Sequence, residues 1–272
     1  MIFGAGIDTS FENHLMVMLS RFQDLHKLKF YIYVLDLESV LRKREALPTT
    51  LGVNIFHIPV DLRHWPTVYD QLSANGFVFK DSIADTNVCT IAMEECVFCY
   101  MDEASVKTIM QEMVRAFAED TLFLRYMPLL SPHCGESKTV STSFSAVLRD
   151  GFASRGVPIL SGDGAVEMVE ERFHRAGWLR TLCMDVQTAL NAFFAPEELI
   201  ISAALDSFDE FASLATINRC YAIVVSALSV DLFESTVRQF HAYTICDNAV
   251  ERNRLLRIQT GHSQIPPEAF QK

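Results

Sequence analysis

The stretch VCTIAMEECVFCYMDEASVKTIMQEMVRAFAEDTLFLRYM, residues 88–127, decides the fold class. Its first part, 88–98, is a short apolar run that predicts a buried strand. Residues 103–118 carry apolar side chains at helical spacing and predict an amphipathic helix. Residues 120–127 are again an apolar run of strand length. A strand, a helix and a second strand in this order predict a β-α-β unit with parallel strands.

The same alternation continues toward the amino terminus. A strand stub at residues 2–3 precedes a helical pattern at 10–26, and further apolar runs predict strands at 30–38 and 53–62. Each of these two strands is followed by a helical pattern, at 38–47 and at 65–77, the second ending at Asn75-Gly76. The chain therefore predicts an α/β fold with a mainly parallel sheet covered by helices on both faces.

The second half of the chain is less regular. Residues 128–163 are rich in Pro, Gly, Ser and His, and we expect them to form an insertion, with a helix, over the carboxyl ends of the strands. Helices at 168–178 and 196–214 and strands at 179–186 and 217–230 follow. We expect one domain, 1–230, and a C-terminal extension of unknown role, 231–272.

The charge balance argues against a nucleic-acid partner. The 272 residues include 23 Lys and Arg but 34 Asp and Glu, a formal net charge of -11, whereas binding to a phosphate backbone depends on Lys and Arg. Seven cysteines without a disulfide framework indicate reduced thiols, and Cys96 and Cys99 have no second pair at zinc spacing. We expect a cytoplasmic protein with no membrane partner and no metal; the oligomeric state is left open.

Glycines and acids stand at successive strand ends. Gly4 and Gly6 follow the first strand, Asp36 the second and Asp61 the third, and Glu95 lies at the end of the fourth. Ligands of parallel sheets bind outside the carboxyl ends of the strands, and an acid after the second strand can accept hydrogen bonds from ribose hydroxyls. Each acid alone is better explained as a helix cap or a solvated charge. Together, at four strand ends, they favour a nucleoside site.

The glycine motif narrows the class of ligand. No lysine follows it, so it is not a P-loop, and Thr9 breaks the G-x-G-x-x-G of dinucleotide-binding proteins. A dehydrogenase would also need a recognisable proton-transfer residue, and none stands out. The pattern is typical of class I methyltransferases, which bind S-adenosylmethionine.

Four segments resemble the leucine carboxyl methyltransferase family. They are FGAGIDTSF (3–11), YVLDLESVLRKR (33–44), VDLRHWPTVYDQL (60–72) and TIAMEECVFCYMDEASV (90–106). The last of them is the most specific, and the resemblance extends over roughly residues 1–227.

The resemblance implies a class I, Rossmann-like fold with a seven-stranded, mainly parallel sheet and an insertion after strand five. It implies methyl esterification, by S-adenosylmethionine, of the C-terminal leucine carboxylate of protein phosphatase 2A-type catalytic subunits. That carboxylate is ionised at pH 7, so no general base is needed. By the same resemblance, Gly4 and Gly6 approach the methionine part of the cofactor, Asp36 binds its ribose, and Asp61 and Leu62 bind its adenine. Glu95 lies beside the cofactor, and Tyr100 positions the acceptor.

Several departures from the family leave alternatives open. Glu94 replaces a usual alanine, residues 125–128 replace N-Y-E-Q, and residues 142–145 replace D-R-F-G. Family members also carry several dozen residues before the glycines, including a Lys and an Arg that contact carboxylates. We therefore expect this chain to lack an N-terminal segment and to fold and act weakly without it, with Arg63 and Arg125 at the surface. The alternatives are a tRNA wybutosine-type carboxyl methyltransferase and an inactive cofactor-binding or interaction paralogue.

Overall fold

Seven strands form one sheet in the computed structural model, which describes residues 1–4, 6, 29–43, 53–82, 88–130, 140–193 and 211–242. The strands are β1 (Ile2–Phe3), β2 (Phe30–Asp36), β3 (Val53–Pro59), β4 (Thr90–Glu95), β5 (Thr121–Pro128), β6 (Arg180–Asp185) and β7 (Tyr221–Ala227). Their order is β3-β2-β1-β4-β5-β7-β6. Only β7 runs antiparallel to its neighbours in this sheet. The predicted seven-stranded, mainly parallel sheet is confirmed.

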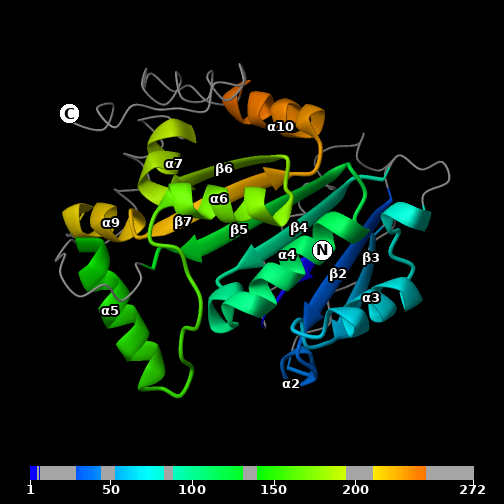
Figure 1. The fold of residues 1–272 in the computed structure, drawn as a ribbon, viewed down its shortest axis with the longest axis horizontal. Coiled ribbons are helices and arrows are strands. Elements are labelled where there is room, and N and C mark those ends of the chain that lie inside the picture. Colours follow the sequence, from blue (N-terminus) through cyan, green and yellow to red (C-terminus); the bar gives the residue numbers. More distant parts are fainter. Residues whose placement is uncertain are drawn as a thin grey trace.

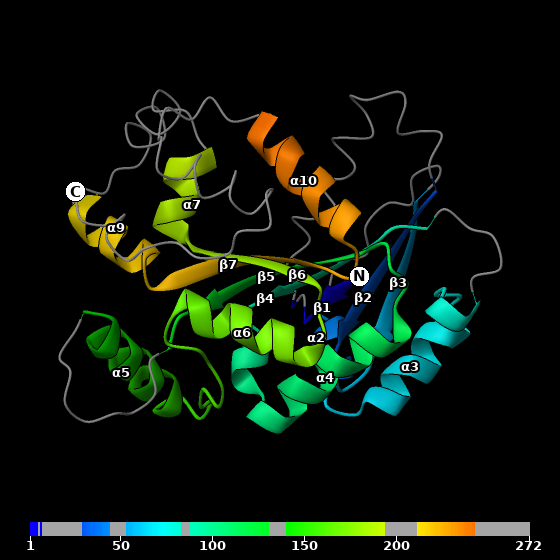
Figure 2. The ribbon, with the colours of Figure 1, turned by 45° about the horizontal axis from the view of Figure 1, so that its top comes forward.

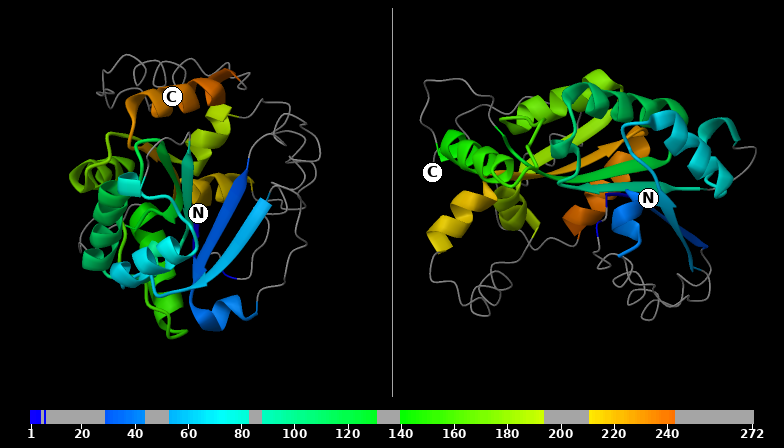
Figure 3. Two further views of the ribbon diagram at one scale, coloured as in Figure 1. Left: turned by 90° about the vertical axis from the view of Figure 1, so that its right-hand side faces the viewer. Right: turned by 90° about the horizontal axis from the view of Figure 1, so that it is seen from below.

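Helices cover both faces of the sheet. One face carries α3 (Trp65–Ala74), α4 (Glu103–Ala116) and α6 (Val166–Ala176), and the other carries α7 (Val186–Phe193) and α10 (Val230–Ala242), as Figures 1 and 2 show. Figure 3 shows the short α2 (Glu38–Leu41) on the same side as α10. The helices α5 (Val140–Ala153) and α9 (Phe211–Asn218) lie together at one end of the sheet (Figure 1). None of the helices in these described ranges has the length and apolar character to cross a lipid bilayer.

The larger core lies between the sheet and the layer formed by α3, α4 and α6. Phe123 of β5 is at its centre and contacts the rings of Phe3, Phe98, Phe173 and Trp178. A smaller core on the opposite face joins β5, β6 and β7 to α7 and α10, and includes Phe233 of α10. Because side chains alternate between the two faces of a strand, one apolar run supplies both cores.

The sequence also explains where the helices begin and end. The Asp102 side chain accepts the Ser105 N–H at 2.9 Å and caps α4. Asn75 caps the end of α3 as predicted, and Gly177 ends α6 with φ 103°, a left-handed conformation that favours glycine.

The structure corrects some element boundaries. The predicted strand 88–98 ends at Glu95, because the chain turns at Cys96 into a short 3-10 helix, η3 (Phe98–Tyr100). The strand predicted at 217–230 begins only at Tyr221, since α9 continues to Asn218. The helix α7 was not predicted. The expected helix at 10–26, the end of the one at 38–47 and most of the one at 196–214 fall outside the described residues. The domain boundary at residue 230 stays a prediction, although α10 packs on the sheet.

Candidate functional site

The predicted site residues meet at one edge of the sheet. The strands β3, β2, β1 and β4 are neighbours and parallel, so their carboxyl ends lie side by side. The glycine bend follows β1, Asp36 and Glu95 end β2 and β4, and Asp61 follows β3. The strand order reverses between β1 and β4, which is where ligands of such sheets bind. We call this part of the sheet the cofactor edge.

Asp36 holds the glycine bend in place. Its Oδ2 accepts the Gly6 N–H at 2.8 Å and its Oδ1 accepts the Leu37 N–H at 2.7 Å. Gly4 N–H donates to the Leu35 carbonyl at 2.7 Å, so the bend leaves β1 directly beside β2. Each carboxylate oxygen has a further lone pair that ribose hydroxyls can use.

Both glycines have left-handed backbone conformations, with φ 59° at Gly4 and 60° at Gly6, but their surroundings differ. A Cβ added to Gly4 would lie 2.5 Å from Val97 Cγ2, whereas no atom of the described residues stands within 4 Å of one added to Gly6. The first glycine is needed for close packing against the turn after β4. The second meets no such contact among the described residues, and its left-handed backbone is the conformation that favours glycine.

Asp61 is engaged by a neighbour. Arg63 donates to both of its carboxylate oxygens, with Nε 2.9 Å from Oδ1, and the Arg63 N–H donates to Oδ1 at 3.0 Å. These bonds hold the pKa of the Asp61 carboxyl below its usual range. Arg63 is exposed, as predicted, and Leu62, the residue between them in the sequence, is buried. The Asp61 carboxylate therefore stays charged at neutral pH.

Glu95 and Tyr100 stand on either side of the turn between β4 and η3. Glu95 is exposed at the end of its strand, and the Tyr100 ring lies 5.8 Å from that of Phe152 in α5. Burial raises the pKa of the Tyr100 phenol. The helix α5 belongs to the predicted insertion, so the insertion contacts the turn that carries the predicted acceptor residue.

An aromatic wall, formed by Tyr126, Tyr221 and Phe144, lies next along the edge. The rings of Tyr126 and Tyr221 stack 5.4 Å apart at an interplanar angle of 2°, and Phe144 of α5 meets Tyr221 edge-on at 5.5 Å. Burial, with smaller contributions from Cys96, Tyr221 and Glu95, raises the pKa of Tyr126 to about 12. The sequence analysis missed this wall. The sequence signal was Tyr126 near the end of the predicted strand 120–127 and Tyr221 near the start of the predicted strand 217–230.

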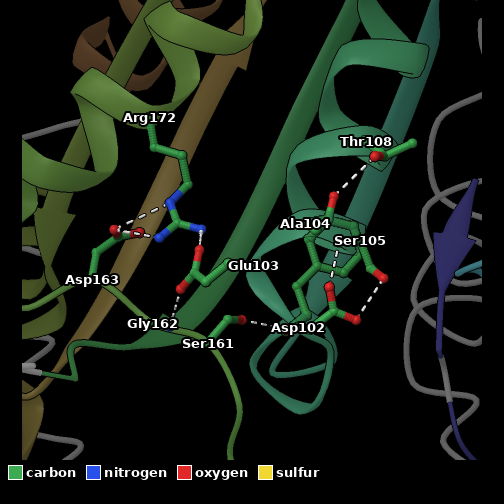
Figure 4. Close-up of polar contacts among 10 residues, drawn as sticks. Asp102, Glu103, Ala104, Ser105, Thr108, Ser161, Gly162, Asp163 and Arg172 are labelled. Carbon is green, nitrogen blue, oxygen red and sulfur yellow. Dashed lines mark hydrogen bonds and ion pairs between the residues drawn. The ribbon is translucent and has the colours of Figure 1, made fainter.

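A charged cluster fastens the end of the insertion, as Figure 4 shows. Arg172 of α6 donates to Asp163 Oδ1 from Nη2 at 2.8 Å and to Glu103 at the start of α4. Ser161 Oγ donates to the Phe98 carbonyl at 2.7 Å, and the Gly162 N–H donates to Glu103 Oε1 at 3.3 Å. The chain leaving the insertion is thereby attached to η3, α4 and α6 at once.

Comparison with known proteins adds evidence from sequence. No family model matches the chain. It is 26% identical to leucine carboxyl methyltransferase 1 of Yarrowia lipolytica over 151 residues, which are 55% of this chain and 43% of that protein. It is 28% identical to the leucine carboxyl methyltransferase 1 homolog of Arabidopsis thaliana over 156 residues, 57% of this chain and 42% of that one. Over about half of its length the chain is similar to the leucine carboxyl methyltransferases. Its matching part spans about two fifths of the length of these relatives.

One solved structure agrees on the fold. A DUF574 family protein from Streptomyces avermitilis superposes with a TM-score of 0.54 at 11% identity, covering 83% of this chain and 73% of that one. An S-adenosylmethionine-dependent methyltransferase from Mesorhizobium loti gives 0.47 at 11% identity, with 83% and 88% covered. The seven-stranded sheet with one antiparallel strand, flanked by helices, is the class I S-adenosylmethionine-dependent methyltransferase fold.

One expectation about a basic residue near this edge is wrong. Arg125 was expected at the surface, but its side chain is 2% exposed. Its Nε donates to Glu94 Oε2 at 2.6 Å, and its guanidinium lies 5.2 Å above the ring of Phe98. The Glu94 side chain is 0% exposed. A buried arginine needs such partners, and Glu94, the residue that departs from the family pattern, provides the charge.

The thiols of the same turn are inert groups. Burial raises the pKa of Cys96 and of Cys99 to about 12 each, so both are protonated at neutral pH. The part of the chain that the structure describes brings together no three His, Cys, Asp or Glu side chains that could hold a metal ion.

Proposed function

We propose that this chain is an S-adenosylmethionine-dependent carboxyl methyltransferase that esterifies the C-terminal leucine carboxylate of a protein phosphatase 2A-type catalytic subunit. The observation that carries the proposal is the Asp36 carboxylate, which holds the glycine bend at the point where the strand order reverses. The relationship to the leucine carboxyl methyltransferases supports the choice of acceptor.

The cofactor edge offers the groups that a sulfonium nucleoside needs. Asp36 would bind the ribose hydroxyls, and Gly4 and Gly6 would let the backbone approach the methionine part. Asp61 and Leu62 would hold the adenine, with Glu95 beside the cofactor. When bound, S-adenosylmethionine supplies an electrophilic methyl group.

The acceptor side of the proposed site excludes water rather than moving protons. The phenol of Tyr126 and the thiol of Cys96, each with a pKa of about 12, stay neutral at pH 7 and do not compete as nucleophiles. Tyr100 would orient the acceptor on η3. A leucine carboxylate is already ionised, so alignment and desolvation are the remaining tasks of the protein.

Calorimetric titration with S-adenosylhomocysteine tests the cofactor part of the proposal. Asp36→Asn is expected to weaken binding at least tenfold, because an amide offers the ribose one acceptor oxygen instead of two. Asp185→Asn is the matched control: Asp185 also ends a strand and accepts a backbone N–H, from Thr188 at 2.9 Å, but it lies on β6 at the far end of the sheet. A parent protein without measurable affinity would refute the cofactor assignment.

Methyl transfer then separates the acceptors. We expect labelled methyl groups on a phosphatase tail peptide that ends in leucine, and none on the same peptide with an amidated C-terminus. Label on tRNA alone would instead support the wybutosine-type alternative. Binding of S-adenosylhomocysteine without transfer to either acceptor would support the inactive paralogue.

A further inference from the structure

The buried carboxylate of Glu94 connects the sheet to the turn at the cofactor edge. Its Oε2 accepts from Arg125, its direct neighbour in the β4–β5 ladder. Its Oε1 accepts two backbone N–H groups, those of Val97 and of Phe98, the latter at 2.8 Å. One side chain therefore joins strand β5 to the first residues of η3.

The turn that Glu94 holds has an unusual backbone. Cys96 has φ 53°, a left-handed conformation that residues other than glycine adopt infrequently. Its N–H donates to the Tyr126 carbonyl at 2.9 Å. A backbone of this kind persists where the surrounding contacts fix it. The two residues after Cys96, Val97 and Phe98, are the ones whose N–H groups donate to Glu94.

The position of the turn determines the position of the glycine bend. Val97, held by Glu94, packs so closely on Gly4 that a Cβ there would lie 2.5 Å from its Cγ2. Asp36 fixes the bend from the β2 side, and Val97 supports it from the β4 side. Glu95 directly precedes this turn, and Tyr100 ends the η3 helix that follows it.

We propose that the Glu94–Arg125 pair is a positioning device for the cofactor: the Glu94 carboxylate sets the turn that supports Gly4 and carries Glu95, and Arg125 neutralises that carboxylate inside the protein. Neither residue is placed in contact with the cofactor. The proposal rests on the proposed function, since it concerns the same site.

Two double variants separate positioning from general stability. Both carry Arg125→Met, which removes the buried cation, and they differ only at position 94. Glu94→Gln keeps an oxygen that can accept the Val97 and Phe98 N–H groups, whereas Glu94→Ala removes it. Because each double variant removes both charges, neither leaves an unpaired charge in the core. Thr181→Val/Ser226→Ala is the control, since it removes a partly buried hydroxyl pair, 2.8 Å apart, at the opposite edge of the sheet.

The readouts are the thermal midpoint without ligand and the dissociation constant for S-adenosylhomocysteine. We expect the Ala double variant to bind at least tenfold more weakly than the parent, and the Gln double variant and the hydroxyl control to bind within threefold of it. Equal affinities of the two double variants, or losses that only follow the thermal midpoints across all variants, would overturn the positioning role alone. A parent protein that does not bind would overturn the cofactor assignment and this proposal with it.

Discussion

Replacing Gly4 by alanine tests the close contact between the glycine bend and the turn after β4. Two effects add at this position. The left-handed backbone, φ 59°, is unfavourable by about 1–2 kcal/mol for a residue with a side chain. The new Cβ would also overlap Val97, and overpacking of this kind costs about 1–3 kcal/mol. The free energy of unfolding should fall by about 2–5 kcal/mol in total.

Gly76 provides the matched control. It has φ 78°, but none of the described residues has an atom within 4 Å of an added Cβ. Gly76→Ala should therefore lower the free energy of unfolding by about 1–2 kcal/mol, the backbone part alone. Urea unfolding followed by tryptophan fluorescence measures both variants, since Trp65 and Trp178 are buried in the core.

A double-mutant cycle isolates the contact itself. In a Val97→Ala background the overlapping methyl groups are absent, so Gly4→Ala should be less destabilising there by about 1–3 kcal/mol. If Gly4→Ala destabilises both backgrounds equally, or no more than Gly76→Ala does, the bend does not pack on Val97 as described.

Two charged pairs give further predictions. Arg172→Met should lower the free energy of unfolding by about 3 kcal/mol in the same urea titration, because it leaves the buried Asp163 carboxylate unpaired. Arg175→Met on the same helix removes an exposed ion pair and should change the free energy of unfolding by less than about 0.5 kcal/mol. Similar losses in the two variants would contradict the stabilising role of the Arg172–Asp163 ion pair. Arg63→Met should raise the pKa of Asp61 toward its ordinary value of 3.8, measured by carboxyl NMR. Because the pKa of Asp61 is lowered in the folded parent, the parent is more stable than the variant above pH 3.8, and this advantage disappears as the pH falls through the lowered pKa. Identical pKa values of Asp61 in the two proteins would contradict the ion pair.

The alternation of strands and helices was readable because buried parallel strands are continuous apolar runs. The cofactor edge was readable for a related reason: parallel strands present their carboxyl ends together, so Asp36 and Asp61 come close whatever separates them in sequence. The direction of β7 was not readable, since an apolar run is the same in either direction. The helix α7 was missed because its eight residues follow Asp185 directly, with no loop to mark a boundary.

The buried pair could not be found from composition, because a single arginine in an apolar run is most often a surface residue. Its partner is 31 residues away in sequence. Only the parallel pairing of β4 with β5 places Glu94 beside Arg125, on the same face of the sheet. A charge in each of two successive buried strands is the clue, because neither can be buried without the other. Two unfavourable features stand close together in this turn: the buried carboxylate of Glu94 and the left-handed backbone of Cys96, two residues later. Departures of this kind concentrate at functional sites, and this one adjoins the glycine bend.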